Sequence, residues 1–83
     1  MLKTDFEAFV EEQIERAANK IATGKSAKLD DVGFGRMGFY LALRRVLMGT
    51  SSAEDLGLIG AVNDALQALK LLDSDETFLG GVL

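Results

Sequence analysis

The sequence contains no cysteine, no histidine, no proline and no tryptophan. Without cysteine, the chain has no disulfide, no thiol nucleophile and no thiolate metal site. Without histidine, it lacks the commonest general base and the commonest metal ligand, and a serine–histidine triad is impossible. We therefore expect a protein that is not an enzyme and that uses no cofactor and no metal ion.

Positive charge is scarce as well. Nine basic residues stand against 13 acidic ones, which gives a net charge of −4. The imbalance lies in the C-terminal part, because Lys70 is the only basic residue of residues 51–83. Nucleic-acid binding through a general basic surface is therefore disfavoured, and we do not expect a nucleic-acid partner.

Long apolar runs are also missing. The longest, residues 37–43, is far shorter than the ~20 residues that span a bilayer. Asp5 and Glu7 would interrupt the apolar part of a signal peptide. We expect no membrane association and a cytoplasmic location, which the absence of cysteine also favours.

What the sequence does contain is helical periodicity in a chain long enough for one domain, residues 1–83. Hydrophobic residues make up 48% and charged residues 27%, an ordinary globular balance. No alternating run is long enough to predict a strand. The sequence predicts an all-α fold, a small bundle of three main helices at about 5–23, 34–48 and 52–72, with a short apolar C-terminal tail at 73–83.

The first two predicted helices differ in character. The first has one apolar face, begins at a capping box of Thr4 and Glu7, and ends at Gly24. Residues 25–32 are predicted to form a polar connection, with Asp30 or Asp31 as the next N-cap. The second helix is apolar around most of its circumference and closes at Gly49, so we expect it at the centre of the bundle.

The third predicted helix begins at a second capping box, Ser51 to Glu54. Small residues recur along it at four-residue spacing, which would let another helix approach closely. Leucine and valine at alternating four- and three-residue spacing predict a helix-pairing seam. The candidate helix–helix contacts are Gly57, Ala61, Ala65, Leu58, Val62 and Leu69.

Residues 33–38 spell G-x-G-x-x-G, the pattern of a dinucleotide-binding turn. That function requires a preceding buried strand in a βαβ unit, and residues 25–32 are too polar to form one. We interpret these glycines as allowing a tight helix start and close packing.

Two groups of residues are candidate contacts with a partner protein. They are Arg36, Tyr40, Arg44 and Arg45 on the second predicted helix, and Phe78 and Leu79 in the tail. Arginine and tyrosine are enriched at binding hot spots. Both groups have an intramolecular alternative. The arginines could pair with Glu11, Glu12 or Glu15 while Tyr40 covers the core edge, and the tail could fold back over the helices.

These features predict a non-enzymatic protein–protein interaction module that associates with itself, because the second helix has more apolar surface than two neighbours cover. One alternative is a small acidic inhibitor or regulator, of the kind that phages and mobile elements encode, which binds a basic groove on a host or defence protein. Two others are a structural subunit of a larger assembly and, less favoured, a helical DNA-binding regulator.

Overall fold

The structure is a computed structural model and describes residues 2–23 and 26–82. It contains three helices, α1 (Lys3–Thr23), α2 (Ala27–Met48) and α3 (Ala53–Ala68), followed by a tail of turns over residues 69–82. These described ranges contain no strand. The prediction of an all-α fold with three main helices is confirmed.

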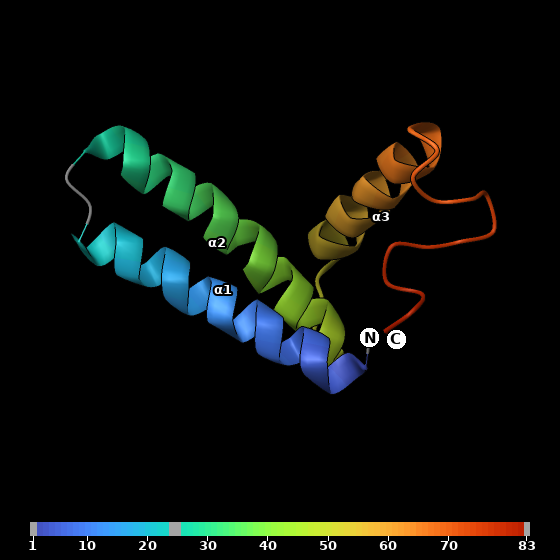
Figure 1. Ribbon diagram of the computed structural model, residues 1–83, viewed down its shortest axis with the longest axis horizontal. Helices are drawn as coiled ribbons and strands as arrows, with labels where there is room; N and C mark the ends of the chain where they lie inside the picture. Colours follow the sequence, from blue (N-terminus) through green and yellow to red (C-terminus); the bar gives the residue numbers. More distant parts are fainter. Residues whose placement is uncertain (1, 24–25, 83) are drawn as a thin grey trace.

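The three helices are not packed evenly (Figure 1). α1 and α2 lie antiparallel and side by side along their whole lengths, whereas α3 touches only the C-terminal part of α2. Within the described chain, α1 and α3 do not approach each other. The second helix is therefore the central one, as expected, and one side of α3 has no helix packed against it.

The core lies near the end of the α1–α2 pair where the tail crosses it. Its buried residues are Val10 from α1, Leu43 and Leu47 from α2, and Leu79 from the tail. Phe6, Ile14, Phe39, Tyr40, Val46, Ile59, Phe78 and Val82 pack around them. Burying these apolar side chains away from water is the main force holding the three segments together.

The predicted helix starts are wrong for α1 and α2. α1 begins at Lys3, so Thr4 lies inside it and cannot be its N-cap. Instead, the carbonyl oxygen of Leu2 accepts hydrogen bonds from the backbone N–H groups of Asp5 and Phe6, both at 3.1 Å. Gly24, the predicted end of this helix, lies outside the described residues.

α2 begins at Ala27 rather than near residue 34, so most of the predicted connection is helical. Asp30 lies in the first turn, where a carboxylate interacts favourably with the helix dipole. Gly33 is then well inside α2, and a Cβ atom on it would lie 2.8 Å from Ile21 Cγ1. The prediction of close packing at this glycine is confirmed, and that of a helix start is wrong.

α3 begins one residue later than predicted and ends earlier, at Ala68. Its N-cap is Ser52, and the capping box joins Ser52 to Asp55, not Ser51 to Glu54. The helix stops before Lys70, whose φ of 61° lies in the left-handed region. Gly49, with φ of 75°, ends α2 as predicted.

Candidate interaction surfaces

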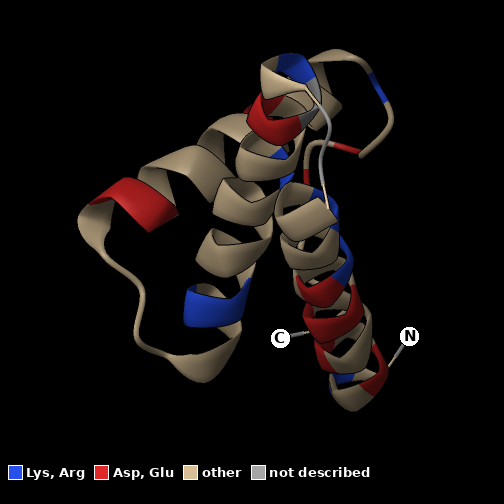
Figure 2. Ribbon diagram, turned by 90° about the vertical axis from the view of Figure 1, so that its left-hand side faces the viewer, with Lys and Arg blue, Asp and Glu red and all other residues tan. Residues whose placement is uncertain are grey.

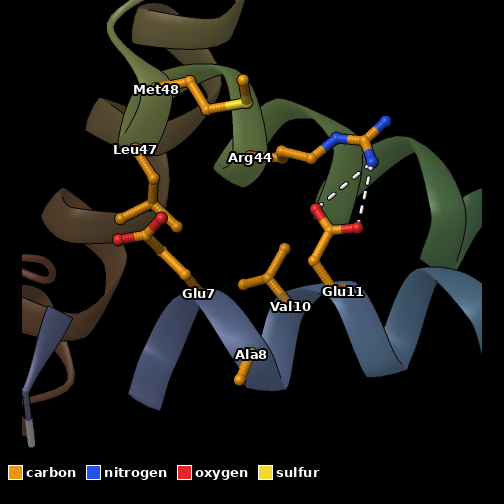
Figure 3. Close-up of a pocket in the computed structure, with 7 residues that line it drawn as sticks. All are labelled: Glu7, Ala8, Val10, Glu11, Arg44, Leu47 and Met48. Carbon is orange, nitrogen blue, oxygen red and sulfur yellow. Dashed lines mark hydrogen bonds and ion pairs between the residues drawn. The ribbon is translucent and has the colours of Figure 1, made fainter. Parts of the chain in front are cut away.

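Arg44 joins α2 to α1. Its Nη1 donates hydrogen bonds to Glu11 Oε1 and Oε2, each at 3.2 Å (Figure 3). Both side chains remain partly exposed to water, and ion pairs of this kind stabilise a fold by about 0–1 kcal/mol. Of the two alternatives for Arg44, the structure shows the intramolecular one, in which this arginine pairs with an acidic residue of α1.

Arg45 joins α2 to α3 through a tighter contact. Its Nε and Nη2 donate to the two carboxylate oxygens of Asp55, at 2.6 and 2.7 Å. The backbone N–H of Ser52 donates to the same carboxylate at 3.0 Å. The hydrogen bonds from Arg45, and secondarily from Ser52, lower the pKa of Asp55, and the pKa of Arg45 is raised in turn. This bidentate contact fixes α3 against the end of α2.

Tyr40 belongs to an aromatic cluster at the edge of the core. Its ring meets those of Phe9 and Phe39 edge-on, with centroids 6.0 and 5.7 Å apart. Arg36, one turn earlier, is exposed, and the ion pairs of the described chain do not include it. The candidate group on α2 is thus divided: Arg44, Arg45 and Tyr40 make contacts within the chain, while Arg36 faces solvent.

The tail folds back over the helices. Leu79 is only 6% exposed and belongs to the core, and Phe78 is half-buried beside it. The Phe78 N–H donates to Asn63 Oδ1 at 2.7 Å, and Gln67 Nε2 donates to the carbonyl oxygen of Glu76 at 2.7 Å. The tail is therefore attached to α3 and to the core. For Phe78 and Leu79 the structure thus shows the intramolecular alternative, in which the tail folds back over the helices.

The side of α3 that faces away from α2 carries small residues together with two carboxylates. We call this surface the outer face of α3. It consists of the exposed residues Ala53, Glu54, Gly57, Gly60, Ala61, Asp64, Ala65 and Ala68. Exposed leucines border it, with Leu56 at one edge and Leu58 and Leu69 at the other.

The predicted helix–helix contacts can now be located. Gly57, Ala61, Ala65, Leu58 and Leu69 are exposed on or beside the outer face of α3, whereas Val62 is half-buried. Within the described residues, no helix of the same chain covers this face. As contacts with another chain, these residues remain a prediction.

Among the hollows lined by described residues, one lies between α1 and α2 and one between α2, α3 and the tail. The smaller, about 160 Å³, is between α1 and α2 beneath Met48, and the Arg44–Glu11 pair forms one wall (Figure 3). The larger, about 330 Å³, is an open and mainly apolar groove between α2, α3 and the tail. Its walls include Val46, Leu56, Ile59, Asn63 and Phe78. Neither hollow brings together a nucleophile and a base.

The motifs of the sequence do not form a site for chemistry. Residues 33–38 are all helical and lie inside α2, so the G-x-G-x-x-G pattern is neither a turn nor a helix N-terminus that could hold a phosphate. Across residues 2–23 and 26–82, no acidic side chains gather into a group that could bind a metal ion. In the same residues, no helix has the length and apolar character to cross a membrane.

Charge is distributed unevenly over the helices. In Figure 2, the helix beside the N label, α1, carries more acidic residues than either of the other helices, whose ribbons are mainly tan. The exposed carboxylates after α2 are Glu54, Asp64, Asp73, Asp75 and Glu76. Asp55 differs from these because Arg45 neutralises it.

Comparison with known proteins gives no matching family, no matching curated protein and no matching solved structure. The argument for function therefore rests on this geometry alone.

Sequence reasoning missed Asp55 and Asn63, which fix the positions of α3 and of the tail. Asp55 follows Ser52 at the spacing of a capping box. The sequence therefore offers two overlapping capping boxes, and the prediction took Ser51 to Glu54, which has the more usual S-x-x-E pattern. Asn63 gave no signal, because its partner is a backbone N–H group 15 residues away.

Proposed function

We propose that the protein is a non-enzymatic protein–protein interaction module that associates with itself. The observation that carries this proposal is its surface area. The chain exposes 5815 Å², whereas a compact monomer of 8.9 kDa exposes about 4800 Å². The difference is similar to the roughly 800 Å² that each partner buries in a standard interface.

The shape of the molecule supports the same proposal. The Cα radius of gyration is 14.1 Å, against about 12 Å for a compact domain of this length. Several large apolar side chains are more than half exposed, among them Met48, Leu56, Leu69 and Leu71. Single exposed leucines are ordinary, but groups of them are typical of interaction surfaces. We also propose a cytoplasmic location, which the absence of cysteine favours.

Thermal unfolding at several protein concentrations tests self-association. Association stabilises the folded state by mass action, so a 100-fold increase in concentration adds up to about 2.7 kcal/mol. For a domain of this size we expect Tm to rise by several degrees between about 1 and 100 μM. A Tm that does not change with concentration would contradict the proposal.

An acidic inhibitor is the second candidate, and the distribution of charge favours it. Asp73, Asp75 and Glu76 are exposed in the tail, and Lys70 is the only basic residue after α2. Such a surface complements a basic groove of the kind that reads nucleic acid. Binding to an arginine-rich peptide should weaken steeply with added salt and on neutralising these three carboxylates. Absence of binding at low salt would remove this candidate.

A further inference from the structure

We infer that two copies of this chain exchange their tails, so that Leu79 of each copy fills the core of the other. The tail opens at residues 69–72, which we call the hinge, where α3 then continues as a helix instead of turning back. This inference rests on the proposed self-association and names its surface and its partner. The surface is the core around Val10, Leu43 and Leu47, and the partner is the tail of a second copy.

The hinge is held in a backbone conformation that its sequence does not favour. Lys70 has φ of 61°, and within residues 2–23 and 26–82 it is the only residue other than glycine with a positive φ. The Lys70 N–H donates to the Gln67 carbonyl oxygen at 3.0 Å, and the Leu71 N–H donates to that of Leu66 at 2.9 Å. These bonds define a helix-ending turn whose left-handed position usually belongs to glycine, because a Cβ atom there crowds the backbone.

The same residues favour a longer helix. Leu69 and Leu72 continue the three- and four-residue apolar spacing of α3, so the sequence predicts a helix to Leu72, although α3 ends at Ala68. Lysine and leucine are both good helix formers. Straightening the hinge therefore removes the left-handed conformation of Lys70 and adds about one helical turn to α3.

The tail has a matching site on the first two helices. Leu79 is buried among Val10, Leu43 and Leu47, which belong to α1 and α2. Between the hinge and this anchor, residues 73–77 are all exposed. The tail thus turns back at the end of α3 and returns to the α1–α2 pair (Figure 1). The tail of a second copy makes the same contacts, because exchange of an identical element keeps the contacts of the closed chain.

Length favours the core of the second copy once the hinge is straight. A helix continued to Leu72 ends about 20 Å along its axis from Ile59, which packs against the core that holds Leu79. Residues 73–79 span at most about 23 Å when fully extended. A return to its own core would therefore prevent the tail from forming its turns at 73–76 and 77–80. A second copy can approach a tail that keeps these turns.

The hinge also carries apolar surface that the exchange removes from water. Leu69 is 68% exposed and Leu71 is 69% exposed, so the closed chain leaves both in solvent. In a reciprocal exchange the two hinges pass beside each other at the two-fold axis, and these leucines of both copies come together. Burial of large apolar side chains favours association. The exchanged pair therefore gains a contact that the closed chain lacks.

Glycine at the hinge tests whether the conformation of Lys70 controls association. Lys70→Gly fits the closed turn without strain and disfavours the continued helix, so it should weaken self-association at least about tenfold in sedimentation equilibrium. Lys70→Ala removes the same charge but keeps the helical preference, so it should change the dissociation constant by less than about threefold. Equal association of the two variants would overturn the exchange.

Mixed disulfides test whose core each tail occupies, because the chain has no cysteine of its own. The Phe78 N–H donates to Asn63 Oδ1 at 2.7 Å, so these two positions lie next to each other. An oxidised mixture of Asn63→Cys and Phe78→Cys should give the mixed disulfide, which requires the tail of one copy to lie on α3 of the other. The control is a mixture of Phe78→Cys with Ala18→Cys, an exposed position on α1, and it should not cross-link. A mixture of the first pair that associates without forming the mixed disulfide would overturn the exchange.

These tests separate the exchange from the proposed function. If Lys70→Gly associates like the unmodified chain and the mixed disulfide does not form, self-association stands and the exchange of tails is wrong. If the unmodified chain is monomeric at all concentrations, both proposals fail.

Discussion

At the scale of single residues, the contact between Arg45 and Asp55 decides where α3 points. Asp55 is only 5% exposed and receives hydrogen bonds from the Arg45 guanidinium and from the Ser52 backbone. Its carboxylate thereby serves two purposes, capping α3 and anchoring it to α2. A charge held this way stabilises the fold only while it stays ionised.

This arrangement predicts how stability depends on pH. Because the folded-state pKa of Asp55 is lowered from its ordinary value of 3.8, its stabilising effect is fully present above pH 4 and is lost as the pH falls toward the folded-state pKa. We expect Asp55→Asn to lower Tm at pH 7 and to differ less from the unmodified chain as the pH drops below 4. A Tm difference that stays constant from pH 7 to pH 3 would contradict this role.

Gly33 gives a second prediction at this scale, with Gly38 as its matched control. Both lie inside α2, but a Cβ atom on Gly33 would lie 2.8 Å from Ile21 Cγ1, whereas one on Gly38 would meet nothing within 4 Å. Gly33→Ala should destabilise the fold by about 1 kcal/mol, since overpacking costs about 1–3 kcal/mol and alanine recovers about 1 kcal/mol of helix propensity. Gly38→Ala should instead stabilise it by about 1 kcal/mol. Denaturant unfolding of both variants measures the difference, and equal effects would show that α1 and α2 do not approach closely here.

At the scale of helices, the sequence predicts the interior of each element better than its ends. The apolar face of α1 and the helix-ending Gly49 were readable because periodicity and positive φ have local causes. The first turns of α2 could not be predicted from the sequence, because a helix that pairs along its length can begin with polar residues facing water. The positions of Arg45 and of the tail depend on contacts with residues distant in the chain, which local patterns do not record.

The capping box of α3 can be tested with neighbouring serines. The Ser52 side chain accepts a hydrogen bond from the Asp55 N–H at 3.1 Å. Ser52→Ala should therefore cost about 1 kcal/mol, as N-cap losses usually do, and lower Tm by about 4–8 °C. Ser51→Ala, one residue earlier, should change Tm little. A larger loss for Ser51→Ala than for Ser52→Ala would mean that α3 begins where the sequence alone suggested.

At the scale of the whole molecule, the chain forms one close pair of helices and one helix that stands apart. The sequence predicted three helices with α2 at the centre, but not that one side of α3 would remain exposed. Periodicity shows which residues share a helix face but not what covers that face. The account of function follows from the excess of exposed surface.

Sedimentation equilibrium of the unmodified chain, from about 1 to 200 μM, tests the central claim most directly. The account predicts a mass that rises with concentration above the 8.9 kDa of one chain, because self-association is favoured by mass action. A mass of one chain throughout this range would contradict self-association.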